Sequence, residues 1–294
     1  MSYLKQYEYV IAVAKHGGIS QAAEKLGISQ PTFSKYLKKL EGDLGVRLFD
    51  RSTLPIRLTR AGKCFANAGA RFLDLDRQLA KELDEIKNDI SSTVRIGISP
   101  SRSPYAIPEI LASFREISPD TQIVIVEETT AEINKMLTEG ELDIILSIDG
   151  DGTESFERIE LFTEEILLAV PADSEASSAE DAIRTLPLIT AGHGQAMWRL
   201  LMSVAGELGI SRPAIECQSI ESALALVKRG IGATAVPSYV RRDRSDSFRL
   251  FTIPRGVAES YTRKVCLFYR KEQFLSRAER ELIECIVKLE EKDK

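Results

Sequence analysis

The stretch that decides the fold of the N-terminal part reads Ser20-Gln21-Ala22-Ala23-Glu24-Lys25-Leu26-Gly27-Ile28-Ser29-Gln30-Pro31-Thr32-Phe33-Ser34-Lys35-Tyr36-Leu37-Lys38-Lys39-Leu40-Glu41. Ser20 and Ser29 each stand where a side-chain oxygen can cap a helix, and Gly27 can end the first of the two helices. Pro31 is tolerated in the first turn of the second. Two short helices joined by a turn predict a helix-turn-helix over about residues 18–37, whose second helix enters the DNA major groove.

The second of these helices has two different faces. Apolar side chains recur on one side at helical spacing, and hydroxyl and amino groups lie on the other. The apolar set is Phe33, Tyr36, Leu37 and Leu40, and the outward set includes Pro31, Ser34, Lys35 and Lys38. The outward face suits contacts with base edges and phosphates. A solvated face on an ordinary helix is the alternative interpretation.

The charge of the chain is unevenly distributed. Residues 1–62 hold ten Lys and Arg against five Asp and Glu, whereas the remaining residues hold 29 against 39, within a net charge of −5. A small basic domain on an acidic body favours a polyanion partner for the basic part. Chance clustering of solvated charge is the alternative.

Residues 63–92 are predicted to form a long connecting helix and a hinge. Apolar residues recur every seven positions, with further apolar residues three or four positions after each, so that one stripe runs down the helix. The stripe comprises Phe65, Ala68, Phe72, Leu75, Leu79, Leu83, Ile86 and Ile90. At about 1.5 Å per residue the helix is roughly 40 Å long. We expect the stripe to pair with its copy in a second subunit; packing on the chain's own body is the alternative. The hinge is expected at 91–93.

From residue 93 to residue 294 strand and helix patterns alternate. Strands are expected at 94–98, 122–127, 142–147, 165–170, 186–189, 232–236, 248–253 and 264–269, and helices at 104–117, 131–139, 195–208, 219–229 and 277–288. Such alternation predicts an α/β domain with mostly parallel strands. The charged stretches 173–181 and 241–246 are expected to be solvated loops.

Hydroxyl groups and one arginine follow several of these strands. Ligands of open α/β sheets bind beyond the carboxyl ends of strands, where helix N-termini point. The candidate effector contacts there are Ser99, Pro100, Ser101, Arg102, Thr129, Thr130, Ser147, Thr190, His193, Ser219 and Pro237. Because a guanidinium pairs with carboxylate, phosphate or sulfate, Arg102 predicts an anionic small molecule. Helix capping by the Ser and Thr residues, and a loop position without a role for His193, are the alternatives.

The sequence lacks patterns of catalysis, metal binding and membrane insertion. Its four cysteines are far apart, it has two histidines, and no nucleophile, zinc or phosphate-loop motif occurs. We therefore expect no enzyme activity and no cofactor. No apolar run of about 18 residues is present, and the first residues lack a signal peptide's apolar core. The expected location is the cytoplasm, with no membrane partner.

The run from Ser20 to Gly62 resembles the LysR-type transcriptional regulators. The resemblance rests on residue types and their spacing over a stretch of about forty positions. The matching residues are Ser20, Ala22, Ala23, Leu26, Ser29, Gln30, Pro31, Ser34, Leu37, Leu40, Glu41, Leu44, Gly45, Leu48, Phe49, Arg51, Leu58, Thr59, Ala61 and Gly62. Lys35 stands where the family often has arginine; lysine lacks the planar fork of the guanidinium, and this leaves open which base Lys35 reads.

For residues 1–62 the resemblance implies a winged helix-turn-helix with a wing at 48–59 that turns near 53–55. It places residues of the second helix at the groove floor or its phosphate rim, and two arginines of the wing at the backbone or minor groove. The candidate DNA contacts are Gln30, Pro31, Thr32, Ser34, Lys35, Lys38, Arg51 and Arg57. A structural ion pair within the wing is the alternative for Arg51.

For residues 93–294 the resemblance implies two α/β lobes like those of periplasmic binding proteins. Lobe one would comprise 93–164 and 267–294, and lobe two 165–266. The implied function is transcriptional regulation of promoter DNA by a homodimer, or a homotetramer by family resemblance, that responds to a small molecule held between the lobes. An enzyme on a two-lobed scaffold and a solute receptor for transport are the rival classes.

Overall fold

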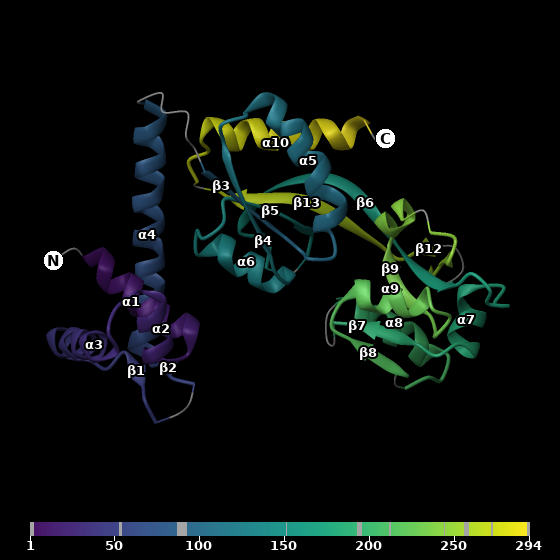
Figure 1. Ribbon diagram of the computed structural model, residues 1–294, viewed down its shortest axis with the longest axis horizontal. Helices are drawn as coiled ribbons and strands as arrows, with labels where there is room; N and C mark the ends of the chain where they lie inside the picture. The colour runs from purple at the N-terminus through teal and green to yellow at the C-terminus, as the bar shows by residue number, and fades with distance from the viewer. Residues whose placement is uncertain are drawn as a thin grey trace.

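The structure is a computed structural model that describes residues 3–52, 55–86, 93–150, 152–192, 196–211, 213–243, 245–255, 259–271 and 273–292. In these residues the chain forms a small N-terminal domain, a long helix and a body of two lobes (Figure 1). The tip of the predicted wing, the predicted hinge at 91–92, Ile90 and His193 lie outside the described residues.

The N-terminal domain packs three helices and a hairpin around one core. The elements are α1 (Tyr3–His16), α2 (Ile19–Lys25), α3 (Gln30–Leu44), β1 (Phe49–Asp50) and β2 (Arg57–Leu58). Phe33 and Leu37 of α3 are fully buried against Val10 and Val13 of α1. The predicted apolar face of the second helix is therefore the face that holds it to the domain.

The helix starts differ from the expected capping pattern. α2 is capped by Gly18 rather than Ser20, because the helix begins one residue before that serine. Ser29 is the N-cap of α3, but its hydroxyl donates to the Thr32 hydroxyl at 2.7 Å and accepts nothing from the backbone. Gly45 ends α3 with φ +67°, a conformation that favours glycine.

The connecting helix α4 (Arg60–Ile86) keeps most of its apolar stripe in solvent. Phe72, Leu75, Leu79, Leu83 and Ile86 are exposed by 45–76%. The first residue of the stripe differs, because Phe65 packs on the N-terminal domain core with its ring 4.9 Å from that of Tyr7. Phe65 is thus a contact within the chain. Phe72 also stacks on the Tyr7 ring, at 5.5 Å between ring centres, but remains 53% exposed.

The opposite face of α4 is polar and contacts lobe one of the body. Asp74 pairs with Arg270 at 3.0 Å, and Lys81 lies between the buried carboxylates of Asp143 and Glu279. The helix therefore packs on its own body through charged groups and leaves its apolar face uncovered.

The body is built on a sheet with strand order β10-β6-β13-β5-β3-β4, with β9 also paired to β6. These strands are β3 (Thr93–Ile98), β4 (Gln122–Glu127), β5 (Ile144–Ile148), β6 (Phe156–Pro171), β9 (Thr234–Pro237), β10 (Phe248–Thr252) and β13 (Thr262–Arg270). Only the pairs of β3 with β4 and with β5 are parallel in this sheet. The prediction of mostly parallel strands is wrong because β6 and β13 cross between the lobes and pair antiparallel with every neighbour.

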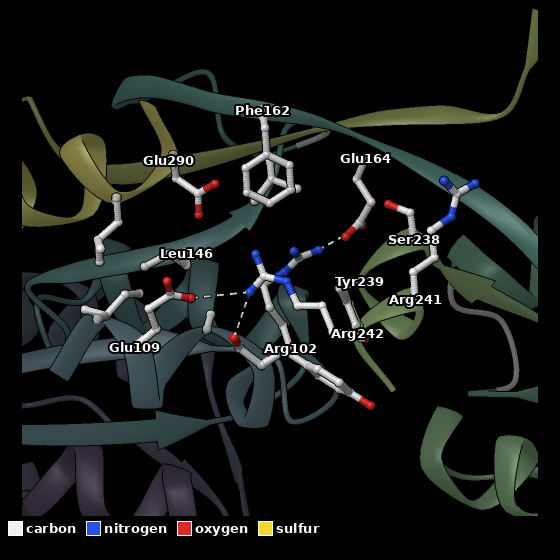
Figure 2. Close-up of a pocket in the computed structure, with 15 residues that line it drawn as sticks. Arg102, Glu109, Leu146, Phe162, Glu164, Ser238, Tyr239, Arg241, Arg242 and Glu290 are labelled. Atoms are coloured by element: carbon white, nitrogen blue, oxygen red, sulfur yellow. Dashed lines mark hydrogen bonds and ion pairs between the residues drawn. The ribbon is translucent and has the colours of Figure 1, made fainter. Parts of the chain in front are cut away.

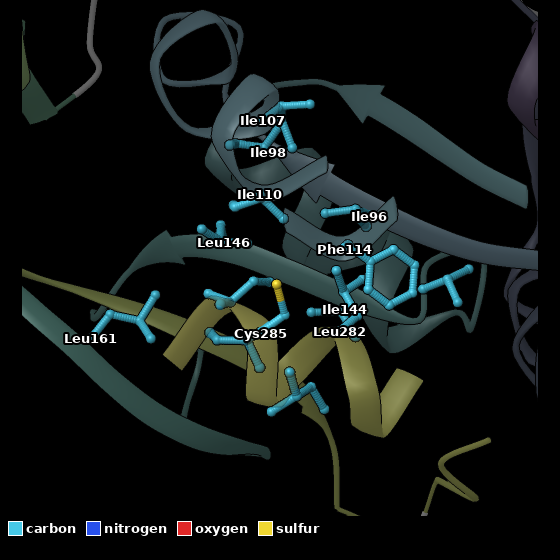
Figure 3. Close-up of a cluster of buried hydrophobic side chains, with 14 of the residues drawn as sticks. Ile96, Ile98, Ile107, Ile110, Phe114, Ile144, Leu146, Leu161, Leu282 and Cys285 are labelled. Carbon is cyan, nitrogen blue, oxygen red and sulfur yellow. The ribbon is translucent and has the colours of Figure 1, made fainter. Parts of the chain in front are cut away.

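Lobe one is covered by α5 (Ser103–Ile117) and α10 (Arg277–Lys292) on one face of the sheet and by α6 (Thr130–Thr138) on the other. Figure 3 shows Phe114 of α5 and Leu282 of α10 meeting Ile96 and Ile144 of the strands, and all four side chains are fully buried. Buried helix faces of this kind hold the start of α5 in place.

Lobe two has its own helices around a parallel strand pair. It comprises α7 (Ala179–Thr185), β7 (Ile189–Ala191), α8 (Ala196–Glu207), β8 (Ile215–Cys217), α9 (Ile220–Val227), the 3-10 turn η1 (Ser238–Arg242), β11 (Pro254–Arg255) and β12 (Glu259–Ser260). Two stretches read as solvated loops are partly structured. α7 buries Ala179, Ala182 and Ile183, and η1 buries Val240. The sequence pattern did not reveal either element, because each contributes only a few apolar residues among charged ones.

The long strand β6 joins the two lobes (Figure 1). It pairs with β13 through Glu165, and with β9 from Ile166 onward. β13 begins at Thr262 opposite Glu165 of β6 and pairs with β5 of lobe one from Val265 onward. The lobe boundary expected at 267 stays a prediction. Among the helices of the described residues, none is both long and apolar enough to cross a membrane.

Candidate functional site

The outward face of α3 presents side chains that the fold does not use. Gln30, Pro31, Thr32, Lys35 and Lys38 are exposed and Ser34 is half-buried. Within the described residues Lys35 and Lys38 form neither an ion pair nor a hydrogen bond. Two unpaired ammonium groups on one helix face favour a polyanion.

The wing is tied to α3 by one carboxylate. Oε1 of Glu41 accepts the backbone N–H groups of Leu48 and Phe49 at 2.8 and 3.2 Å, and its Oε2 pairs with Arg51 at 3.0 Å. Arg51 thus forms a structural ion pair, but its partner lies on α3 rather than within the wing, and the pair holds the wing to that helix. The contact of Arg51 with DNA stays a prediction.

The second arginine of the wing is Arg57. It is exposed and lies across the β1–β2 ladder from Asp50. The Ser52 hydroxyl and backbone N–H donate to Asp50 and hold the pKa of that carboxyl below its usual value. No hydrogen bond or ion pair of Arg57 occurs among the described residues, so its guanidinium is available to a phosphate.

The predicted strand-end residues of the body fall into two groups. Thr129 and Ser219 cap α6 and α9 by accepting the N–H groups of Glu132 and Ser222, which is the alternative role weighed for them. Ser147 and Thr190 are buried, and in the described part of the chain their hydroxyl oxygens have no hydrogen-bond partner. The two unpaired hydroxyls lie in different lobes.

The remaining predicted contacts follow β3 or end β9. Ser99 and Ser101 are half-buried with their hydroxyls 3.5 Å apart, and Pro100 is exposed. Thr130 begins α6 and is half-buried, and Pro237 is buried as the last residue of β9.

Arg102 differs most from its expected surroundings. The sequence places it after the first strand of the body with its guanidinium on an anionic ligand, but only 7% of its side chain is exposed, and its Nη2 donates to Glu164 Oε2 at 2.9 Å. Arg263 donates to the same oxygen at 2.6 Å. A buried carboxylate needs such partners. Because two guanidinium groups share one carboxylate, one positive charge at this point is not neutralised by Glu164.

A pocket of about 360 Å³ opens beside Arg102. Its walls come from α5, β5, β6, β13 and α10 and, on the side of lobe two, from η1. Figure 2 shows an ion pair from Arg102 to Glu164 and another from Arg242 to Glu109 among the lining side chains. The pocket therefore lies where the two lobes meet.

Two tyrosines close the pocket beside this arginine. The ring centres of Tyr105 and Tyr239 are 4.7 Å apart, and the Arg102 guanidinium lies 5.2 Å from the Tyr239 ring centre. Burial raises the pKa of Tyr239 to about 12, against a lowering contribution from Ser101. The phenol is therefore protonated at neutral pH and can donate a hydrogen bond.

The sequence interpretation missed these lining residues because they are far apart in the chain. Glu164 lies within a strand, and Tyr239 and Arg242 belong to η1, of which only the charged end had been noticed. The aromatic Tyr239 shortly after a buried strand was the one available signal.

The fold and the site together define a DNA-binding head joined to a ligand-binding body. Residues 4–63 match the bacterial regulatory helix-turn-helix protein, lysR family, and residues 87–290 match the LysR substrate binding domain. The chain belongs to the LysR family of transcriptional regulators, which bind DNA through the helix-turn-helix and effectors through the body. This confirms the expected fold class and a regulator rather than an enzyme.

Relatives and solved structures agree with this membership. The chain is 28% identical over 297 residues to the uncharacterized HTH-type transcriptional regulator YcgK of Bacillus subtilis, covering 93% of this chain and 90% of that one. It is 26% identical over 240 residues to the DNA-binding transcriptional dual regulator OxyR of Escherichia coli, covering 80% and 79%. The fold matches the crystal structure of CbnR, a LysR family transcriptional regulator, with TM-score 0.65 at 22% identity over 98% and 99% of the chains.

Proposed function

We propose that α3 and the wing of two paired subunits contact two half-sites of promoter DNA. The exposed ammonium groups of Lys35 and Lys38 on α3, which have no ion pair in the described part of the chain, carry this proposal. The contacts would come from Gln30, Pro31, Thr32, Ser34, Lys35, Lys38, Arg51 and Arg57. The Ser29 hydroxyl already donates to Thr32, so Thr32 retains its own O–H for a base or phosphate.

Two single substitutions separate base reading from backbone attraction. We expect Lys35→Ala to weaken the binding free energy for the preferred duplex by about 1–3 kcal/mol. The difference in affinity between the preferred duplex and a scrambled duplex is expected to become smaller. Arg57→Ala is expected to weaken both duplexes alike and to reduce the salt slope by about 1. Fluorescence anisotropy with both duplexes at several salt concentrations measures these effects. Equal losses of Lys35→Ala on the two duplexes would remove Lys35 from base recognition.

We infer that the effector is a small molecule with an anionic group, bound where the two lobes meet. The positive charge left over by Arg102 and Arg263 around Glu164 supports the anionic group. The hydroxyls of Ser147 and Thr190, which have no hydrogen-bond partner among the described residues, support further contacts from both lobes outside the lining of the pocket beside Arg102. Ser99, Pro100, Ser101, Thr129, Thr130, His193, Ser219 and Pro237 stay predicted contacts. Binding would shift the lobes relative to each other and move α4, because α4 is attached to lobe one. We place this regulator in the cytoplasm, with no cofactor.

Several relatives are named hydrogen peroxide-inducible genes activators, among them one of Haemophilus influenzae at 29% identity over 57% of this chain. The cysteines of this chain do not favour peroxide sensing. Cys64 lies on α4 and Cys217 in lobe two, while Cys266 and Cys285 belong to cores on opposite faces of the sheet. Burial raises the pKa of the Cys266 thiol, which lowers its reactivity. A small-molecule effector is the better supported signal.

A further inference from the structure

Charged groups of both signs line the pocket beside Arg102. They are Arg102, Arg241, Arg242, Glu109, Glu164 and Glu290. Arg241 pairs with Glu165 outside the lining, and Arg263 joins Arg102 on Glu164. A carboxylate of a ligand can meet the surplus guanidinium charge at Glu164, and an ammonium group of the same ligand can meet a carboxylate oxygen. The lining therefore suits a zwitterion.

Polar atoms without a hydrogen-bond partner among the described residues indicate where the two charged groups of a ligand would bind. Oε1 of Glu164 is buried without a partner in the described residues, because both guanidinium groups contact Oε2. Nε and Nη1 of Arg102 also form no hydrogen bond there. The buried carboxylate oxygen requires a donor such as an ammonium group, and the guanidinium edge suits a carboxylate.

The distance between these groups limits the length of the ligand's polar end. Arg102 and Glu164 are themselves hydrogen-bonded at 2.9 Å, so the free donors and the free acceptor are neighbours. An ammonium and a carboxylate that reach both must be attached to the same carbon or to adjacent atoms. An α-amino acid has this arrangement.

Apolar side chains also line the pocket, beside the remaining charged groups. Ala106 and Ile110 of α5, Leu146 of β5, Phe162 of β6 and Leu289 of α10 line it. Its volume of about 360 Å³ is near the lower end of the range for small-molecule sites. These walls favour an aliphatic or aromatic side chain over a polar one.

We propose that this pocket binds an α-amino acid with an apolar side chain, with its carboxylate on Arg102, its ammonium on Glu164 and its side chain against α5 and α10. The proposal rests on the proposed function, because it names the chemical class of the effector at the lobe junction. Since η1 of lobe two and α5 of lobe one both line the pocket, occupancy stabilises one relative position of the lobes.

The test is calorimetric titration of the full-length protein with L-leucine, L-phenylalanine, 4-methylpentanoate and 3-methylbutylamine. The last two lack the amino and the carboxyl group of leucine. At least one of the two amino acids is expected to bind, and leucine to bind about tenfold or more tighter than either truncated probe. Absence of binding by both amino acids, or equal affinity for 4-methylpentanoate and leucine, overturns the proposal without any variant.

A variant pair locates the binding. Ala106→Leu places extra volume in the pocket and is expected to lower the affinity for the amino acid that binds by at least about tenfold, whereas Ala112→Leu adds the same volume on the exposed side of α5 and leaves it unchanged. Unchanged affinity in Ala106→Leu overturns the assignment to this pocket. Duplex binding measured on the same samples is independent. If the wild-type protein binds the duplex but neither amino acid, only the pocket proposal is rejected. If it binds an amino acid but not the duplex, the proposed DNA contact is rejected.

Discussion

Leu79→Glu is expected to convert the protein into a monomer and to weaken its binding to two-half-site DNA by about a hundredfold or more. Leu79 is 53% exposed in the middle of the apolar stripe of α4. A carboxylate at this position would be buried without a partner when two stripes meet. Each N-terminal domain then binds its half-site alone, and the affinity gained by linking two such domains is lost. Sedimentation equilibrium and anisotropy on the same duplex measure the two effects.

The control for this substitution is Ala80→Glu. Ala80 is exposed on the same helix, about 100° around the axis from Leu79, so it receives the same charge outside the stripe. We expect it to remain oligomeric. A Leu79→Glu protein that sediments like the wild type would show that the subunits associate through another surface.

Removing Lys81 is expected to cause the largest loss of stability. Its ammonium group lies between Asp143 and Glu279, whose side chains are 5% and 0% exposed. Asp143 also accepts the backbone N–H of Arg95 at 2.7 Å, at the start of the lobe one sheet. Lys81→Ala leaves two buried carboxylates without this partner, and breaking a buried ion pair costs about 3–5 kcal/mol. Urea unfolding followed by circular dichroism measures the loss.

An exposed ion pair provides the comparison. Lys264 pairs with Glu160 at 2.8 Å with both side chains at least 40% exposed, so Lys264→Ala is expected to cost less than about 1 kcal/mol. Similar losses in the two variants would mean that α4 is not held to lobe one by Lys81. The coupling between effector and DNA proposed above would then need another contact.

The head could be predicted from sequence because its determinants are local. The apolar spacing of Phe33, Leu37 and Leu40 sets the orientation of α3, and this leaves Lys35 and Lys38 outward. The same local logic located the exposed stripe of α4. It could not show that Tyr7 of α1 covers Phe65, since that contact depends on how two helices pack.

The structure of the body could be predicted less well, because its strand pairings and side-chain contacts join residues that are far apart in the chain. The strand pattern of 165–170 gave no sign that β6 begins at Phe156 and continues from one lobe to the other. Arg102 was recognised as the charged residue after the first strand of the body, but Glu164, its partner, is 62 residues away. The pocket combines residues of α5, β6, η1 and α10, which no single sequence window contains.

The central claim is that the outward face of α3 reads the bases of duplex DNA, and competition binding tests it most directly. The full-length protein is titrated with the duplex flanking its own gene and with a scrambled duplex of the same composition, between about 50 and 200 mM salt. We expect tighter binding to the flanking duplex, and a log–log salt slope of about −0.9 per phosphate contacted on both. Equal affinity for the two duplexes, or binding that does not depend on salt, would contradict the account.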